Sequence, residues 1–209
     1  MRQSSRTAFI QIAGNLFSKH GFDSIGLDQV ILEVGVSKTT FYKHFESKDE
    51  LILAVLATRH EEEFEALQSK VAQRAGDDPQ GRILAIFDVF DDWFAEPDFR
   101  TCMFLGAATE FPLESDPIHQ AAIHHGSELA RFVREQAVHA GADTEQAAAI
   151  ATQIALLLTG AIVTRQVAKS PNAAKVAKAT AEVLLDRLLP RQPTRANLSP
   201  SDARARTPR

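Results

Sequence analysis

The chain contains one cysteine in 209 residues, Cys102, so an intramolecular disulfide is impossible and a reducing cytosol is the expected compartment. Its first residues, MRQSSRTAF, lack the apolar core of a signal peptide. The longest apolar run, about Ile154 to Val163, is interrupted by Thr159 and Gly160 and is too short to cross a bilayer. We therefore expect a cytoplasmic protein with no membrane partner.

Strand-type alternation of apolar and polar residues is also absent, and the nine prolines and ten glycines cluster at the ends of apparent helices. An all-α fold follows, and 44% hydrophobic content suffices for a substantial core in one or two domains. Excess positive charge is missing too, because the formal net charge is −4 and residues 1–50 carry six Lys/Arg against six Asp/Glu. Affinity for nucleic acid would have to come from a few cations placed on one face.

The pattern of residues 26–51 predicts two short helices joined by a tight turn. The first has one apolar stripe with helical spacing, formed by Leu27, Val30, Ile31 and Val34. Gly35 can end this helix in a left-handed conformation, and the Ser37 hydroxyl can cap the next one. In the second helix Phe41 and Phe45 lie four residues apart and should face inward. This is the outline of a helix-turn-helix DNA-binding motif.

The outward face of the second predicted helix carries hydroxyls, amines and an imidazole. This helix contains no acidic residue, and Glu46 comes only after its end. Thr39 and Lys43 should point most directly outward, and four side chains flank them: Lys38, Thr40, Tyr42 and His44. Such groups bind phosphate oxygens and base edges in the major groove. A plain helical hairpin with a polar face would show the same pattern.

A phosphate-binding corner is expected directly after this helix. Ser47 and Glu50 fit a capping box that starts a third helix. The free N–H groups at its N-terminus, with the full charge of Lys48 beside them, favour an anion.

The run from Phe9 to Val55 resembles the DNA-binding domain of TetR-type transcriptional repressors. The resemblance rests on the order and spacing of several short elements: Leu16-Phe17, Gly21-Phe22, Gly35-Val36-Ser37-Lys38, Phe41-Tyr42, His44-Phe45 and Ser47-Lys48 before Leu51. It covers about a quarter of the chain and implies an N-terminal three-helix helix-turn-helix domain.

The resemblance also implies roles for single residues. Thr40, Tyr42 and Lys48 would contact phosphates, and five residues would set register and read bases: Ser37, Lys38, Thr39, Lys43 and His44. The chain departs from the family pattern at two positions. Gly26 stands where a Ser or Thr usually caps the second helix and touches a phosphate, and Thr39 replaces a common glycine.

Caps and apolar spacing predict the remaining helices. One runs from about Ser5 to His20 before the motif, and six follow, over about 47–73, 79–95, 99–110, 117–140, 143–169 and 171–189. We expect a DNA-binding domain over 1–51, a roughly six-helix effector and dimerisation domain over 52–189, and a disordered basic tail over 190–209.

The last two predicted helices are apolar and rich in small residues, which allow helices to approach closely. Two such hairpins from two chains would form a four-helix interface. A two-fold homodimer would then read both halves of a palindromic operator in double-stranded DNA. Ordinary core packing is the alternative reading.

An aromatic group downstream is the candidate pocket for an apolar or aromatic effector, whose binding in TetR-like proteins typically lowers operator affinity. The predicted lining is Phe87, Phe90, Phe94, Cys102, Met103, Phe104, Glu110 and Phe111, with Trp93 alongside. The same aromatic stripe could be plain core. In certain TetR-like proteins a cysteine at the place of Cys102 senses electrophiles, although apolar neighbours should raise its pKa.

No cofactor and no metal site is expected. His119, His124 and His125 do not share one helix face, and no phosphate-binding glycine loop or GxSxG motif occurs. Two alternatives to an effector-controlled repressor stay open. One is a DNA-binding architectural protein without an effector, and the other is a small all-α enzyme that uses Cys102 as nucleophile.

Overall fold

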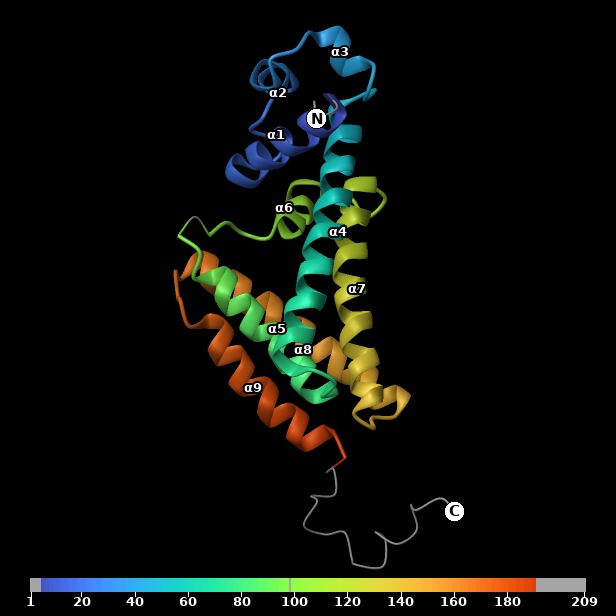
Figure 1. The fold of residues 1–209 in the computed structure, drawn as a ribbon, viewed down its shortest axis with the longest axis vertical. Helices are drawn as coiled ribbons and strands as arrows, with labels where there is room; N and C mark the ends of the chain where they lie inside the picture. The colour runs from blue at the N-terminus through green and yellow to red at the C-terminus, as the bar shows by residue number, and fades with distance from the viewer. Residues whose placement is uncertain (1–4, 98, 191–209) are drawn as a thin grey trace, which may run out of the picture.

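The computed structural model describes residues 5–97 and 99–190, which form nine α-helices and no strand (Figure 1). The all-α class is therefore confirmed. The first four helices are α1 (Ser5–His20), α2 (Leu27–Val34), α3 (Lys38–Tyr42) and α4 (Lys48–Ala75). The other five are α5 (Pro79–Phe94), α6 (Met103–Glu110), α7 (Pro117–His139), α8 (Thr144–Val167) and α9 (Ala173–Leu188).

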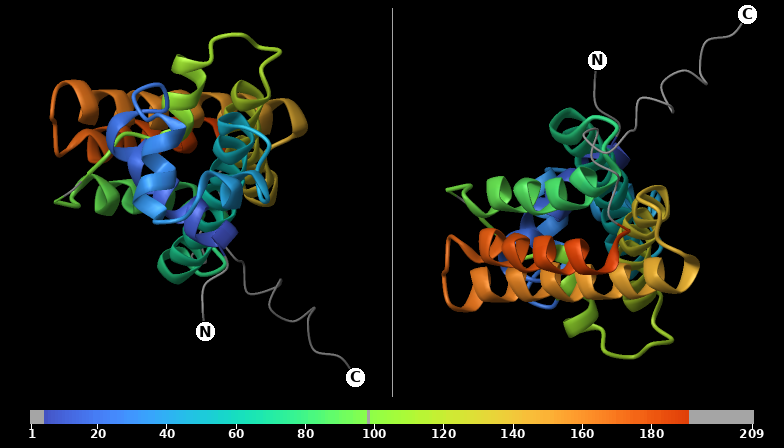
Figure 2. Two further views of the ribbon diagram at one scale, coloured as in Figure 1. Left: turned by 90° about the horizontal axis from the view of Figure 1, so that it is seen from above. Right: turned by 90° about the horizontal axis from the view of Figure 1, so that it is seen from below.

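The molecule is elongated, with α1, α2 and α3 gathered at one end (Figure 1). Helix α4 starts there and runs toward the other end, with α7 along its side. Helices α5, α8 and α9 pack together at the far end, and the view from below shows α8 and α9 side by side (Figure 2). The long α4 therefore belongs to both ends of the molecule.

Most helices begin where their capping residues predict. The Ser47 hydroxyl accepts the N–H of Glu50 at 3.1 Å, and Asp143 and Gln146 form a complete capping box at the start of α8. The predicted box at α4 differs in one respect. The Glu50 carboxylate accepts the N–H of Glu46 at 2.6 Å instead of that of Ser47.

Two helices start later than the sequence pattern suggested. Helix α6 begins at Met103, because the Phe99 ring is held outside it, 5.1 Å from Trp93 and 4.5 Å below the guanidinium of Arg165. Helix α9 begins at Ala173, after a turn in which Lys169 adopts a φ of 54°. The predicted disordered tail lies outside the described residues from 191 onward.

The buried side chains form two clusters, and their division does not follow the predicted domain boundary at residue 51. One cluster fills the space among α5, α7, α8, α9 and the second half of α4. The other lies under α1–α3, but it also contains Met103, Phe104 and Ala107 of α6 and Ile118 of α7. Cys102 packs against both clusters. The helix-turn-helix region therefore shares its core with α6.

Helix α8 is, within the described residues, the one helix long and apolar enough to cross a membrane by length and composition alone. The apolar run from about Ile154 to Val163 is too short to cross a bilayer, but the helix that contains it is 24 residues long. One third of its most apolar window is buried against other helices. A core helix of a soluble protein meets the same criteria.

Three histidines meet between α4 and α7. The Nδ1 atoms of His60 and His125 are 3.1 Å apart, and the His124 ring lies 5.0 Å from that of His60. The Phe104 ring stacks on His125 with centroids 3.7 Å apart. Burial, together with the charges of His60 and His124, lowers the pKa of His125 from 6.5 to about 4.

Protonation of His125 should therefore favour the unfolded state, and stability present above pH 6.5 should be lost as the pH falls toward 4. A His125→Phe variant keeps an aromatic ring against Phe104 without a titrating group. Between pH 7 and pH 5 it should lose about 1–2 kcal/mol less unfolding free energy than the wild type, as measured by urea unfolding. His139→Phe, at an exposed position, is the control. Equal pH dependence of His125→Phe and wild type would refute this account.

Candidate nucleic-acid interface

The turn between α2 and α3 has the predicted construction. Gly35 adopts a φ of 74°, which glycine tolerates without strain, and its N–H donates to the carbonyls of Ile31 and Leu32. The Ser37 hydroxyl accepts the N–H of Thr40 at 3.2 Å and so caps α3. Gly26 precedes α2 without a side-chain cap, as expected for a residue that lacks a hydroxyl.

The inner side of α3 is anchored by aromatic packing. Phe41 and Phe45 are almost fully buried, which confirms their predicted inward direction. Their rings lie 5.3 and 6.0 Å from that of Phe9 on α1, in edge-to-face contacts. This cluster fixes α3 on the end of the molecule.

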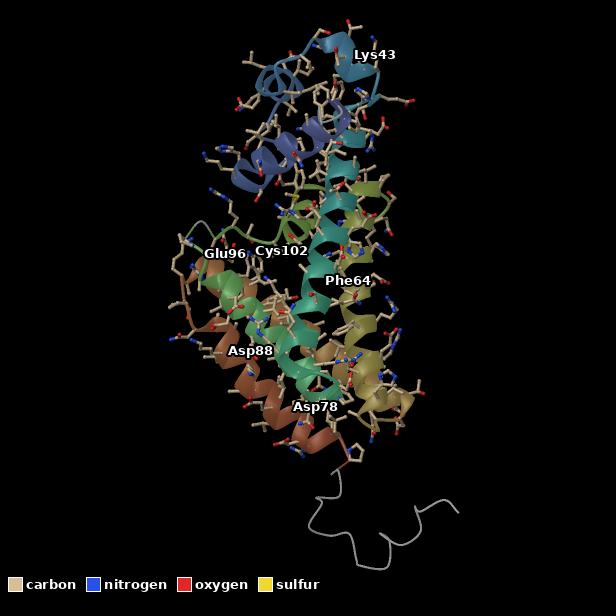
Figure 3. All side chains as sticks on the ribbon, viewed as in Figure 1. Lys43, Phe64, Asp78, Asp88, Glu96 and Cys102 are labelled. Carbon is tan, nitrogen blue, oxygen red and sulfur yellow. The ribbon has the colours of Figure 1, made fainter. Side chains whose placement is uncertain are left out.

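The outer side of α3 is open. Thr39, Tyr42 and Lys43 are exposed, and Lys43 lies at the tip of the molecule (Figure 3). The helix is shorter than predicted, because it ends at Tyr42, and His44 is half-buried in the turn that follows. We name the eight predicted residues the recognition surface: Ser37, Lys38, Thr39, Thr40, Tyr42, Lys43, His44 and Lys48.

Two cations of the recognition surface have partners inside the molecule. Lys38 forms an ion pair with Asp28 of α2 at 2.7 Å, and its hydrogen bond and charge raise the pKa of Lys38. Both side chains are largely exposed, so the pair contributes little to stability. The Lys48 ammonium donates to the carbonyl of Phe22 at 2.7 Å, which ties the start of α4 to the loop after α1.

Arg6 also reaches this end of the molecule, although no sequence pattern indicated it. Its guanidinium lies 5.3 Å from the centre of the Phe45 ring, three residues after the end of α3. No local motif marks an arginine on the first helix for such a role. Only the packing of α1 against Phe41 and Phe45 brings it to the edge of the recognition surface.

A carboxylate of α6 holds the loop after α1. Glu110 accepts the N–H of Phe22 at 3.2 Å and the N–H of Asp23 at 2.7 Å. The Phe22 ring also meets the Phe111 ring edge-on at 5.9 Å. Lys48 donates to the carbonyl of Phe22, so both the N–H and the carbonyl of this residue are hydrogen-bonded to side chains. We call these contacts the α6 joint, and they connect the helix-turn-helix region to the helices downstream.

The eight residues predicted to bind an effector are not gathered around one cavity. Phe87, Phe90 and Phe94 belong to the cluster among α5, α8 and α9, where Phe87 and Phe94 are almost fully buried. The second group packs beneath the helix-turn-helix region and consists of Met103, Phe104 and Phe111. Much of the aromatic stripe is therefore core, the alternative that the sequence had left open.

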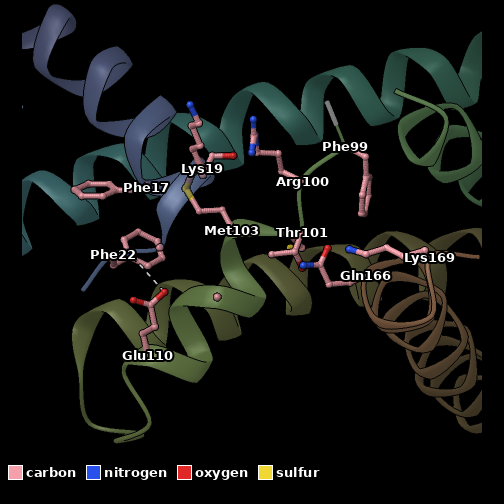
Figure 4. A pocket seen from close by; sticks show the side chains of 14 residues that line it. Phe17, Lys19, Phe22, Phe99, Arg100, Thr101, Met103, Glu110, Gln166 and Lys169 are labelled. Atoms are coloured by element: carbon pink, nitrogen blue, oxygen red, sulfur yellow. Dashed lines mark hydrogen bonds between the residues drawn. The ribbon is translucent and has the colours of Figure 1, made fainter. Parts of the chain in front are cut away.

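Three of the eight, Cys102, Met103 and Glu110, line a cavity of about 250 Å³ between α1, α6 and the end of α8 (Figure 4). We call it the junction cavity. Its other walls come from the end of α1 and the following loop, from the segment 99–101 and from Gln166 and Lys169. It therefore adjoins the α6 joint.

Cys102 is poorly suited to nucleophilic or redox chemistry. Burial, with a smaller contribution from the charge of Glu63, raises the pKa of its thiol to about 11, so the thiol stays protonated at neutral pH. This burial results from its packing against both hydrophobic clusters. These properties fit a small core residue better than a sensor or a nucleophile.

A short helix that projects from a fixed aromatic base, preceded by a glycine turn, defines a DNA-binding regulator of the helix-turn-helix class. Comparison with known proteins gives the family. Residues 10–55 match the bacterial regulatory proteins of the tetR family, and residues 79–181 match the tetracyclin repressor-like C-terminal domain. The chain belongs to the TetR family of transcriptional regulators.

Curated relatives are also regulators. The chain is 37% identical over 99 residues to the HTH-type transcriptional activator FasR of Mycolicibacterium smegmatis, a match that spans 46% of the chain and only 43% of that protein. It is 27% identical over 169 residues to the HTH-type transcriptional regulator LmrA of Bacillus subtilis, spanning 79% and 88% of the two chains.

Solved structures share the whole fold. A TetR-family regulator from Streptomyces coelicolor superposes with a TM-score of 0.79 at 25% identity, covering 90% of this chain and 91% of that one. A TetR-type regulator from Streptomyces avermitilis gives 0.75 at 29% identity, with 89% and 98% covered.

Loss of the second oxygen of Glu110 should loosen the α6 joint. In a Glu110→Gln variant the amide NH₂ would face a backbone donor, so we expect the free energy of unfolding to fall by about 1–3 kcal/mol. The amides of Phe22 and Asp23 should exchange faster with deuterium. Glu114→Gln, an exposed position in the following loop, is the control. Unchanged protection of both amides would show that the carboxylate does not hold this loop.

Proposed function

We propose that the protein is a repressor that binds a palindromic operator as a homodimer in the cytoplasm and is released by a small-molecule effector. The observation that carries the proposal is the outer face of α3, where Thr39, Tyr42 and Lys43 are exposed, Lys43 lies at the tip of the molecule and the helix contains no acidic residue. A helix of this kind fits the major groove.

Within the recognition surface, we assign phosphate contacts to Thr40, Tyr42 and Lys48. The bond from Lys48 to the Phe22 carbonyl supports its assignment, because an ammonium has three donors and a single internal bond positions it while leaving two. Arg6 adds a cation beside α3. Base contacts and register are assigned to Thr39, Lys43 and their neighbours Ser37, Lys38 and His44.

An exposed apolar stripe on α8 and α9 supports a homodimer through residues 143–189. On α8 the stripe has helical spacing and consists of Leu156, Gly160, Val163 and Val167, of which Leu156 is 68% exposed. On α9, Val176 and Val183 lie two turns apart and are 66% and 70% exposed. Such a surface is costly in water, and a second copy of the same hairpin would cover it.

Effector control requires a ligand that prefers the arrangement with low operator affinity. The junction cavity supports such control, because it lies against the α6 joint. Its volume of about 250 Å³ is below the usual range for drug-sized ligands and gives some support to the second candidate function, an architectural DNA-binding protein with no effector. Operator affinity that responds to no small molecule would favour that candidate.

Replacement of Lys48 by Ala should weaken binding to operator DNA at every sequence and lower the slope of log affinity against log salt by about 1 per protomer, because its ammonium is assigned to a phosphate. Tyr42→Phe should weaken binding about fivefold at every sequence if its hydroxyl meets a phosphate. Fluorescence anisotropy at several salt concentrations measures both. Lys70→Ala, on the exposed side of α4, is the control. Wild-type affinity and slope in both variants would reject the surface.

A charge placed on the apolar stripe should dissociate the dimer. The double variant Leu156→Glu/Val183→Glu should sediment as a monomer at micromolar concentration, while its circular dichroism stays helical because both side chains are exposed. Leu113→Glu introduces the same charge at a position that is 69% exposed outside the stripe, and serves as the control. A double variant that remains dimeric would place the interface elsewhere.

A further inference from the structure

The junction cavity has a chemical character of its own. We propose that it binds a small organic anion with an apolar body, such as an aromatic carboxylate, and that this anion is the effector. The inference rests on the proposed function and adds the site and the ligand class. The observations are the charge of the walls, their neutral donors, their apolar patch and the position beside the α6 joint.

Three cations from separate parts of the chain stand at this cavity: Lys19 of α1, Arg100 of the segment before α6, and Lys169 after α8. Within residues 5–97 and 99–190, none of them has a carboxylate at salt-bridge distance. Glu110 is the one acid among the lining residues, and the N–H groups of Phe22 and Asp23 occupy its oxygens. The cavity therefore carries positive charge that an anion would balance.

Neutral donors complete the polar wall. The Thr101 hydroxyl and the Gln166 amide lie between the cations, and Lys169 extends toward them (Figure 4). Helix α6 begins beside them at Met103. Lys169 itself lines the cavity and has a φ of 54°, which non-glycine residues rarely adopt.

The remaining wall is apolar and small. It is formed by the side chains of Phe17, Phe22, Phe99 and Met103. A volume of about 250 Å³ suits a single ring with a short acidic substituent rather than a long chain. A neutral molecule of the same size could contact the aromatic side chains but would leave the charge of the cations without a counter-charge. The cavity should therefore bind it more weakly than an anion.

An occupant of this cavity would touch the end of α1 on one side and α6 and α8 on the other. Gly21, Phe22 and Glu110 line the cavity and also belong to the α6 joint or adjoin it. An anion in the cavity would place a second negative charge in the cavity that the Glu110 carboxylate also lines. Binding would therefore shift the loop after α1 relative to α6, and with it the orientation of α3.

The test uses the full-length protein and three probes of one size: benzoate, benzamide and benzylammonium. Isothermal titration should show benzoate binding more tightly than benzamide, and benzylammonium more weakly than either. Arg100→Gln and Lys169→Gln should each weaken benzoate binding about fivefold, the upper end for exposed ion pairs, and leave benzamide binding unchanged. Lys70→Gln, distant from the cavity, should change neither.

Equal affinity for benzoate and benzamide, or wild-type benzoate affinity in the Arg100→Gln/Lys169→Gln double variant, would overturn the anion site. Operator binding without ligand is measured separately by anisotropy. If the protein binds operator DNA but benzoate shows no charge preference, only the ligand class fails. If benzoate binds as expected but no operator is bound, the regulatory proposal fails and the anion site stands.

Discussion

The attachment of the helix-turn-helix region to α6 depends on one carboxylate. Glu110 of α6 accepts two backbone N–H groups from the loop after α1, while Lys48 at the start of α4 binds the carbonyl of the same loop. Hydrogen bonds to a charged acceptor are stronger than those between neutral groups. Through them and the shared hydrophobic cluster, the helix-turn-helix region is attached to α6 as well as to α4. A shift of α6 would therefore change the position of α3.

This attachment suggests how a small cavity could control DNA binding. The aromatic base of α3, formed by Phe9, Phe41 and Phe45, is closely packed, so we expect the region to move as one body. The junction cavity lies where that body meets α6 and α8. A ligand needs to prefer one orientation by only a few kcal/mol to change the fraction of protein able to bind an operator.

Local patterns in the sequence predicted most helices, because caps and apolar spacing act over three or four residues. Ser47, Asp143 and the glycine turn at Gly35 were read correctly for that reason. The α6 joint could not be predicted, because Glu110 and Phe22 are 88 residues apart. Every residue except proline has a backbone N–H, so residue type does not indicate which one binds a distant side chain. The aromatic stripe was ambiguous, because core and pocket residues share one periodicity.

The most direct test measures the distance between the two recognition helices in the proposed dimer. Spin labels on a Thr39→Cys variant, in a Cys102→Ala background, would report it by pulsed electron resonance. A narrow distance distribution that broadens when Glu110 is replaced by Ala is the result expected if the α6 joint fixes α3. Distributions of the same width with and without the Glu110 carboxylate would contradict the account.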